Sequence, residues 1–577
     1  MPRRSAIGLV LESTILSMIL IVWPASPVLS QPPPLPPGLD IARTAWDMQH
    51  RFAMGYQVAH NPGTDYVHFL WTGWSQVPAS LYDDDRGVYY NCYQISTAFL
   101  TEAYGGVPVV VYPGVSRSGF VDCDLGDDDQ LQATLHQRQD YVPYTSWRLW
   151  FPFPGTALHI DTELGPSTTA WPRIAVQQKQ PDDIVHILAT DCAPEEFFGP
   201  ESDHLPTPVP CAAPMLYWRY DGTAWQGPVT MENQTLSPAY LLTSDRGSDK
   251  VAFVFVSNLE PGMNGMANVV YYESPTAGAG WISGAELDPA FRHVITNYNV
   301  AGGPQAGMDI AAAYDNAGNL HIVWAEQRVP TKSQVAIRHW STATASIRPV
   351  AFGYWDNPVS NGNSIFDLNF AKLTLGVGDG GTICAGTPNT DYLYLVFTQF
   401  GGFTAAELAD YSAGGYMNGE LYLTVSPWGG LGWSVPANLT NTQTPGCDPG
   451  AVPPGGNDPP RPDDVCRSEH WASIGQDVHD IDILFVVDQD AGVVAQGEGT
   501  WQWNYMMYQR HPGGVADAPY VCPLIAPQIG TVFPTTDPPN TFHVLPGDVL
   551  TGESFSVANL GLSELDGEVT VTMGARG

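Results

Sequence analysis

Short apolar stretches recur along the chain, and polar turn residues separate them. The strongest stretches follow a weaker apolar partner and precede an aromatic-rich stretch such as Met215–Tyr220. They lie at residues 66–71, 184–188, 251–255, 320–324, 392–397 and 481–485. Runs this short, rich in β-branched and aromatic residues, are typical of strands rather than helices. The sequence therefore predicts an all-β protein built from a repeat.

A fourth stretch with a tryptophan completes several copies of the repeat, namely residues 223–225, 279–281 and 431–434. Four antiparallel strands repeated in this way build the blades of a β-propeller. A weaker copy has residues 131–137 as its second strand and 147–153 as its third. With this copy the chain has seven blades, and without it six.

The last copy of the repeat shows no tryptophan strand after Tyr508, whereas the N-terminal region offers one. Thr44-Ala45-Trp46 matches Thr223-Ala224-Trp225 and precedes the first blade. An N-terminal strand that completes the last blade would remove an exposed sheet edge. We therefore expect this strand to close the ring.

The two ends of the chain differ from the repeat region. Arg3 and Arg4 precede a short apolar stretch and a small-residue exit at Val28 and Ser30, which is typical of a secretory signal peptide. The apolar stretch is too short to favour a membrane anchor, and no other stretch could span a bilayer. Residues 542–577 show three alternating strands that resemble the opening of an immunoglobulin-like adhesion module, of the kind that bacteria append to exported proteins. The predicted order is a signal peptide (1–30), a Pro-rich spacer (31–40), a β-propeller (41–522), a Pro-rich linker (523–541) and a partial β-sandwich-like segment (542–577).

The composition of the chain excludes some classes of partner and structure. The 577 residues contain 59 Asp and Glu against 23 Lys and Arg, a formal net charge of −36. Such a chain repels phosphate backbones, so a nucleic-acid partner is excluded. Hydrophobic residues make up 44%, which excludes intrinsic disorder for the chain as a whole.

All eight cysteines follow the predicted signal peptide, and an even number after an export signal favours disulfides. Two close pairs bracket Pro-rich loops, Cys192 with Cys211 and Cys447 with Cys466, and we expect both to be disulfides. The pairing of the other four, at positions 92, 123, 384 and 522, stays open. No C-x-x-C spacing indicates zinc.

The stretch Asp309–Gln327 resembles a blade core of the sialidase-like propeller superfamily. Tyr220-Asp221-Gly222-Thr223-Ala224-Trp225 resembles a degenerate Asp-box, the turn motif of those proteins. The resemblance covers about residues 41–511 and implies the propeller fold. The aromatic-Arg-Ile-Pro motif of sialidases is missing, since Ala175 follows Arg173-Ile174. The resemblance therefore does not imply sialidase activity.

Two groups of residues stand out as candidate chemistry. Acidic residues cluster at Asp122, Asp124, Asp127, Asp128 and Asp129, which indicates either a solvated turn or a Ca²⁺ site; no other cofactor is expected. His68, His186 and His321 occupy the same strand position in different copies, so they point to repeated packing rather than to a shared metal.

The second group lies where inner strands begin near the mouth of the central funnel. It consists of Arg51, Arg173, Asp309, Asp367, Glu469 and His470. Because inner strands converge on one axis, these groups are expected to form a small-ligand site or a carboxylate pair for glycoside hydrolysis; the alternative is a wet channel lining.

Long loops are predicted on the same face as the funnel mouth, at residues 74–87, 191–214, 399–419 and 441–467. A propeller with long loops on one face presents a large recognition surface. The leading hypothesis is therefore a secreted, non-catalytic propeller that binds an extracellular glycan or protein. The alternative is a sialidase-like or other glycan-active hydrolase or lyase that uses the funnel, since one propeller scaffold hosts both.

Overall fold

The computed structural model describes most of the repeat region and little of the two ends. The described residues are 36–50, 53–60, 63–74, 86–109, 118–127, 130–138, 144–151, 159–164, 169–179, 182–191, 214–232, 239–258, 260–262, 266–300, 303–328, 334–354, 370–378, 392–401, 409–426, 429–448, 465–494, 498–511, 533–534 and 555–556. The predicted signal peptide lies outside them. Within them, no helix is long and apolar enough to cross a membrane.

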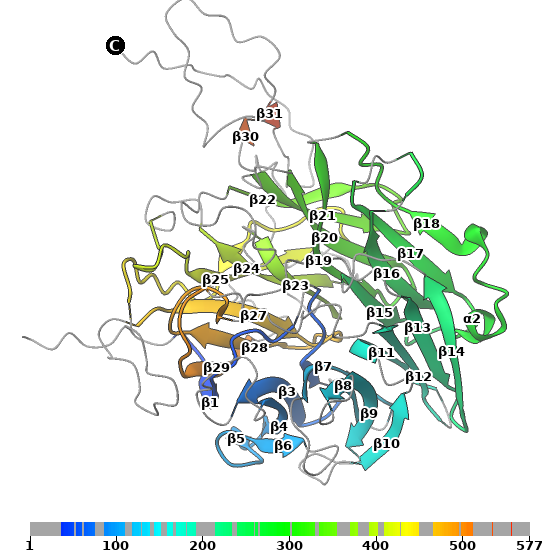
Figure 1. The fold of residues 1–577 in the computed structure, drawn as a ribbon, viewed down its shortest axis with the longest axis horizontal. Helices are drawn as coiled ribbons and strands as arrows, with labels where there is room; N and C mark the ends of the chain where they lie inside the picture. The colour runs from blue at the N-terminus through cyan, green and yellow to red at the C-terminus, as the bar shows by residue number, and fades with distance from the viewer. Residues whose placement is uncertain are drawn as a thin grey trace, which may run out of the picture.

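The described strands form a β-propeller with almost no helix, as predicted (Figure 1). Antiparallel sheets follow one another along the chain. The first contains β2 (Val58–His60), β3 (Tyr66–Trp74), β4 (Arg86–Gln94), β5 (Phe99–Leu100) and β6 (Val107–Val109). The second contains β7 (Ser118–Leu125), β8 (Leu131–Arg138), β9 (Tyr144–Phe151) and β10 (His159–Leu164), which corresponds to the weaker copy of the repeat.

The middle of the chain repeats the same four-stranded order. The third sheet contains β11 (Thr169–Gln177), β12 (Ile184–Asp191), β13 (Met215–Tyr220) and β14 (Trp225–Glu232). The fourth contains β15 (Tyr240–Ser244), β16 (Val251–Ser257), β17 (Asn268–Ser274) and β18 (Arg292–Val294). The fifth contains β19 (Pro304–Tyr314), β20 (Leu320–Arg328), β21 (Gln334–Ser341) and β22 (Arg348–Tyr354).

The last two sheets bring the chain back to its start. The sixth contains β23 (Phe370–Gly378), β24 (Tyr392–Phe400), β25 (Gly419–Ser426) and β26 (Ala437–Asn438). The seventh contains β27 (Ser468–Ile474), β28 (Ile481–Asp488), β29 (Asn504–His511) and, as its outer strand, β1 (Leu39–Thr44). β1 pairs antiparallel with β29, so the N-terminal strand completes the last sheet, as expected.

The closing strand differs from the prediction in its position. Ala45 and Trp46 follow β1 instead of belonging to it. The Thr44 hydroxyl accepts a hydrogen bond from the Trp46 amide at 3.0 Å, a local side-chain contact that competes with the strand ladder. Trp46 is buried against Trp74, with ring centroids 5.0 Å apart. The tryptophan therefore serves as a core residue beside the strand.

Two of the predicted tryptophan strands are wrong. Residues 279–283 form the short helix α2 (Ala279–Ser283), which is bounded by Gly278 and Gly284 in left-handed conformations, with φ of 73° and 79°. Residues 431–434 lie before β26 and form no strand. Trp281 and Trp433 are nevertheless buried, so the pattern identified core positions correctly and their backbone wrongly.

The core lies between neighbouring sheets. Between the third and fourth sheets, for example, Tyr217, Phe253, Phe255 and Trp281 are fully buried in one apolar cluster. Phe253 and Phe255 stack at 4.6 Å, and Tyr217 meets Trp281 edge to face at 5.0 Å. Each sheet is thus apolar on both faces, which explains the near-continuous apolar runs of the second strands.

Bulges recur in the inner strands and shape the axis. The pairing registers of β7, β11, β23 and β27 with their second strands shift at equivalent points. The shifted segments contain Phe120, Trp171, Lys372 and Trp471, all with φ between 50° and 57°. A β-bulge re-aims the side chains that follow it. Asp122 and Arg173, which resume the pairing in β7 and β11, both line a cavity near the axis.

The C-terminal prediction is tested only at two short strands. β30 (Phe533–Pro534) pairs with β31 (Phe555–Ser556). β30 falls in the predicted linker, and β31 falls in the predicted sandwich-like segment. A two-stranded pair of this size does not confirm an immunoglobulin-like module. The other predicted strands of that segment lie outside the described residues.

Candidate functional site

The chain between β1 and β2 fills the centre of the ring. Strands of one sheet alternate in direction, so β1 ends on the face where β2 and the other inner strands begin. The connecting residues reach the axis there, where Figure 1 shows the dark blue trace entering the ring. The Tyr56 hydroxyl lies 3.1 Å from the Ala312 carbonyl oxygen of β19 and 2.9 Å from the Leu375 carbonyl oxygen of β23. Tyr56 therefore reaches strands of the fifth and sixth sheets from the entrance to the first.

The backbone at Tyr56 and Gln57 is also held by hydrogen bonds to the second and seventh sheets. The Tyr56 amide donates to Asp122 Oδ1 at 2.6 Å, and the Gln57 amide donates to Ser473 Oγ at 2.8 Å. The Tyr56 carbonyl accepts from the Cys123 amide at 2.9 Å. This connection, which we call the axial segment (residues 45–57, with 51 and 52 outside the described residues), is thus bonded to several sheets at once.

Arg173 braces the axial segment rather than facing solvent. Its side chain is buried, and Nη1 donates to His50 Nδ1 at 2.9 Å while Nη2 donates to the Ala53 carbonyl at 2.5 Å. Nε donates to the Tyr240 carbonyl of β15 at 3.3 Å. Burial lowers the pKa of Arg173, and the neighbouring Asp122 carboxylate opposes that change. Burial likewise raises the pKa of Asp122 to about 6, partly offset by Arg173.

Gly55 is closely surrounded by the side chains of Arg173, Asp122 and His50. A Cβ at this position would lie 2.7 Å from Arg173 Nη1, 2.7 Å from Asp122 Oδ1 and 2.8 Å from His50 Cε1. No side chain larger than hydrogen fits there without displacing these groups. Because Gly55 has no side chain, the backbone of the axial segment comes close enough for both Arg173 and Asp122 to contact it.

Among the described residues, the cavity beside the axial segment is small. A cavity lined by Gly55, Tyr56, Asp122, Arg173 and Thr374, among others, has about 10 Å³ available to the centre of a water molecule. That is room for about one water and far too little for a sugar. Asp309, Glu469 and His470 do not line it.

Asp309 joins two blades. Its Oδ1 accepts a hydrogen bond from the Lys372 amide of the next inner strand at 2.7 Å. Burial raises the pKa of Asp309 to about 6, and the charge of Lys372 works against that rise. The carboxyl group is therefore buried at a position where it links two inner strands.

Glu469 lies in a buried group of carboxyls between the sixth and seventh sheets. Both of its oxygens lie 2.6 Å from Thr442 Oγ1. Burial, followed by the neighbouring Glu420, raises the pKa of Glu469 well above its usual range. Burial also raises the pKa of Glu420 to about 7. His470, the next residue, is buried with Nε2 3.6 Å from Asp488 Oδ2.

The predicted funnel group is therefore not gathered at one open mouth in the part of the chain that the structure describes. Arg173 contacts the axial segment, Asp309 links two sheets, and Glu469 and His470 belong to other buried groups. Arg51 and Asp367 lie outside the described residues. As a ligand site, this set of six stays a prediction.

The acidic cluster of β7 also has structural partners. Asp122 Oδ2 accepts from the Ile174 amide at 3.1 Å, and Asp124 Oδ2 accepts from the Val176 amide at 2.8 Å, both on β11. Asp127 donates its amide to Asp183. No three His, Cys, Asp or Glu side chains among the described residues are placed to hold a metal ion. Asp128 and Asp129 lie outside them, and the Ca²⁺ expectation stays a prediction.

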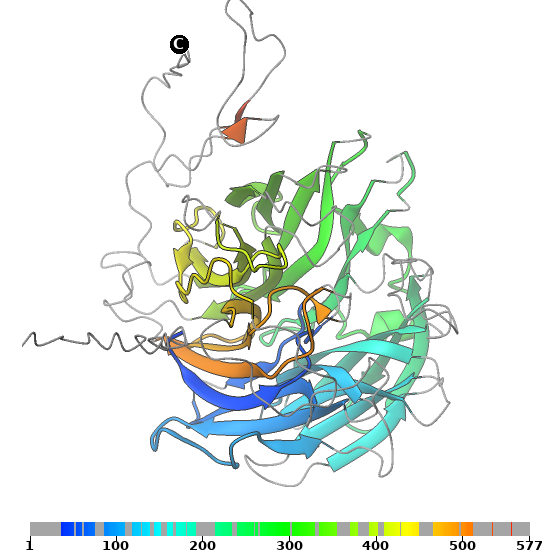
Figure 2. The same cartoon turned by 60° about the vertical axis from the view of Figure 1, so that its left-hand side comes forward.

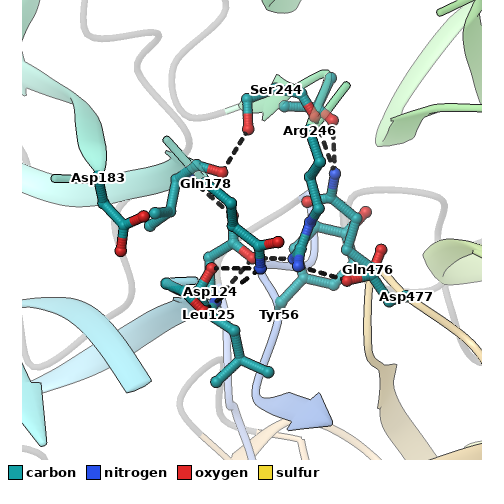
Figure 3. Close-up of polar contacts among 12 residues, drawn as sticks. Tyr56, Asp124, Leu125, Gln178, Asp183, Ser244, Arg246, Gln476 and Asp477 are labelled. Atoms are coloured by element: carbon teal, nitrogen blue, oxygen red, sulfur yellow. Dashed lines mark hydrogen bonds and ion pairs between the residues drawn. The ribbon is translucent and has the colours of Figure 1, made fainter. Parts of the chain in front are cut away.

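A second arginine, which sequence reasoning missed, closes the opposite end of the axis. Arg246 follows β15, and Figure 3 shows it between Asp124 and Asp477. Its Nη2 lies 2.7 Å from Asp124 Oδ1, and its Nη1 lies 2.5 Å from Asp477 Oδ2. Although burial alone would lower the pKa of Arg246, the neighbouring acidic groups, Asp477 and Asp124 first among them, outweigh it and raise the pKa. The sequence signal that could have identified Arg246 is a single Arg within an acidic turn, Ser244–Asp249.

The repeated histidines behave as packing residues in their sheets. His68, His186 and His321 are all fully buried. In each of them, Nδ1 lies within hydrogen-bond distance of a side chain on the third strand. The partners are the Tyr90 hydroxyl at 3.0 Å, the Tyr217 hydroxyl at 2.6 Å and His339 Nε2 at 3.0 Å. One contact repeated around the ring is what a repeat-determined position predicts.

Two local sequence features have clear geometry. Cys447 and Cys466 form a disulfide with an S–S distance of 2.05 Å, whereas Cys192 and Cys211 lie outside the described residues.

Asp221 Oδ1 accepts from the amides of Thr223 at 3.0 Å and Ala224 at 2.9 Å, which closes the turn between β13 and β14. This turn contains the stretch that resembles an Asp-box.

Comparison with known proteins gives only distant similarities. No family model matches the chain, and no curated protein matches it. Among solved structures, a polysaccharide lyase family PL25 ulvan lyase is similar, with 9% identity, a TM-score of 0.42, and coverage of 82% of this chain and 95% of its own. A mutant of the Aleuria aurantia lectin is 11% identical, with a TM-score of 0.32, and covers 69% of this chain and 97% of its own. A protein of unknown function from Dyadobacter fermentans is 7% identical, with a TM-score of 0.37, and covers 68% of this chain and 95% of its own.

Proposed function

We propose that the protein is a secreted, non-catalytic β-propeller that binds an extracellular glycan or protein. We also infer that each of the seven sheets of four or five strands is one blade of the ring. The recognition surface includes the long loops predicted on one face, and the central funnel serves as a structural element.

The observation that carries this proposal is the filled axis. A funnel site needs an open concave space with polar groups converging on it. Here the axial segment occupies the funnel, Arg173 and Asp122 bind that segment, and the cavity beside them holds about one water. Among the described members of the predicted funnel group, Asp309 and Arg173 make contacts that join neighbouring sheets.

A glycan array combined with an activity screen on sialyl, arabinan and uronate substrates tests the proposal. We expect binding of the full chain to an immobilised glycan or an extracellular protein, and no turnover of any of the three substrate classes. Turnover that Asp309→Asn or Glu469→Gln abolishes, in a variant that keeps the wild-type melting temperature, would contradict the proposal. Such a result would favour a glycan-active hydrolase or lyase.

A further inference from the structure

A hairpin of the first sheet covers the outer edge of the closing strand. The hairpin runs from the end of β4 to β6, and its Gly105 amide donates to the Ile41 carbonyl of β1 at 3.0 Å. The Tyr104 hydroxyl donates to Asp40 Oδ1 at 3.1 Å. These contacts cross the point where the two ends of the propeller meet. Figure 2 shows the light-blue end of the hairpin projecting beside the dark-blue strand β1.

Within the described chain, exposed large apolar side chains are concentrated at this junction. Four of the nine exposed large apolar side chains lie on β1 and the hairpin, namely Leu39, Phe99, Tyr104 and Val107. They include both aromatic rings of the nine, Phe99 at 72% and Tyr104 at 56% exposure. Aromatic rings are costly to leave in water, and exposed apolar side chains with polar neighbours are typical of interaction surfaces.

A fixed hydrogen-bond donor and acceptor lie next to the exposed Tyr104 ring. The Arg43 guanidinium carbon lies 3.3 Å from the centroid of the Tyr505 ring, so the aromatic face holds its plane. Arg43 Nη2 lies 3.4 Å from Asp40 Oδ2, and the two side chains are 35% and 27% exposed. The pair is therefore partly exposed, and its orientation is fixed. It is too exposed to contribute more than about 1 kcal/mol to folding.

We propose that Asp40, Arg43, Tyr104 and Tyr505, together called the junction site, bind one pyranose unit of a neutral glycan. The apolar face of the sugar ring packs on Tyr104, because an exposed aromatic ring offers a flat apolar surface with a polar rim. Two neighbouring hydroxyls then meet the pair, one donating to the Asp40 carboxylate and one accepting from the Arg43 guanidinium. The inference rests on the proposed function and assigns its ligand class and place.

Charge selects a neutral sugar over an acidic one. Arg43 and Asp40 cancel each other, so the junction site has no surplus positive charge for a uronate or a sulfate. The chain as a whole carries −36 and repels anionic polymers at a distance. The Asp40–Arg43 pair can bind sugar hydroxyls without any net charge on the ligand. The affinity of the junction site is therefore expected to change little with salt concentration.

Affinity electrophoresis of the full chain in native gels tests the inference. The gels contain galactan or galactomannan as neutral polymers of pyranose units, polygalacturonate as an acidic one, or no polymer. We expect retardation in at least one neutral gel and none with polygalacturonate. Tyr104→Ala and Arg43→Gln should each weaken the apparent affinity at least tenfold, while Tyr104→Phe, which keeps the ring, retains most of it. Val300→Ala removes an apolar side chain that is 65% exposed elsewhere and is the matched control.

The outcomes separate the junction site from the proposed function. Lack of retardation in every neutral gel, or retardation only with polygalacturonate, overturns the inference. Wild-type retardation that Tyr104→Ala and Arg43→Gln leave unchanged overturns the site and leaves a glycan-binding propeller in place. If the array also finds no glycan or protein partner, the proposed function fails as well. Melting temperatures of all variants within a few degrees of wild type show that the fold is intact.

Discussion

The axis and the outer junction of the ring use similar residues for opposite purposes. At the axis, an arginine, an aspartate and a tyrosine (Arg173, Asp122, Tyr56) are buried, and their polar groups bind the backbone of other sheets. At the junction, Arg43, Asp40 and Tyr104 keep part of their surface in water. Burial turns such groups into structural braces whose removal costs folding energy, whereas exposure leaves them free to contact a ligand. The comparison predicts that axis variants change stability and junction variants change binding.

The largest expected effect is at the axis. Arg173→Ala leaves Asp122 buried without its neighbouring cation and removes the donors that hold His50 and Ala53. We expect a loss of about 3–5 kcal/mol in the free energy of unfolding, measured by chemical denaturation. An unchanged stability with reduced ligand binding would contradict the comparison, because it would place Arg173 in a binding site.

The pH dependence of stability should report the buried carboxyls of the axis. Burial raises the pKa of Asp309 from 3.8 to about 6. Because the folded protein then holds this proton more tightly than the unfolded chain, the stabilisation is full below about pH 4 and is lost as the pH rises through 6. The shift corresponds to about 3 kcal/mol at most. Denaturation of wild type and Asp309→Asn between pH 4 and 7.5 should show a smaller decrease with pH for the variant, and parallel curves would refute this role of Asp309.

A smaller effect is expected from Tyr56→Phe. The substitution keeps the ring in place and removes the donor to the Ala312 and Leu375 carbonyls. The two buried acceptors then lose the one hydroxyl proton that they share, which should cost about 1–3 kcal/mol. Thermal and urea denaturation measure the change. Stability equal to wild type would mean that Tyr56 does not tie the axial segment to the opposite sheets.

The smallest effect on stability is expected at the junction. Tyr104→Ala removes a ring that is 56% exposed, so the free energy of unfolding should change by no more than about 0.5 kcal/mol. The same denaturation experiment measures it. A loss above about 2 kcal/mol would show that Tyr104 stabilises the closure of the ring and would erase the contrast with the axis.

The sequence by itself determined the repeat, the all-β class and the closure by an N-terminal strand. These follow from local apolar patterns, and a pattern that recurs in every sheet needs no knowledge of distant contacts. The buried histidines His68, His186 and His321 were assigned to packing for the same reason.

Only the tertiary structure decided what lies at the axis. Residues at the starts of inner strands were expected to share an open funnel because the strands converge, but convergence also brings in the axial segment. Nothing local in Gly55 or Tyr56 indicates that they contact strands hundreds of residues away. The position of Arg246 between Asp124 and Asp477 likewise depends on three sheets meeting. Local pattern fixes which residues form strands, whereas the space left at the centre of a closed ring depends on every sheet at once.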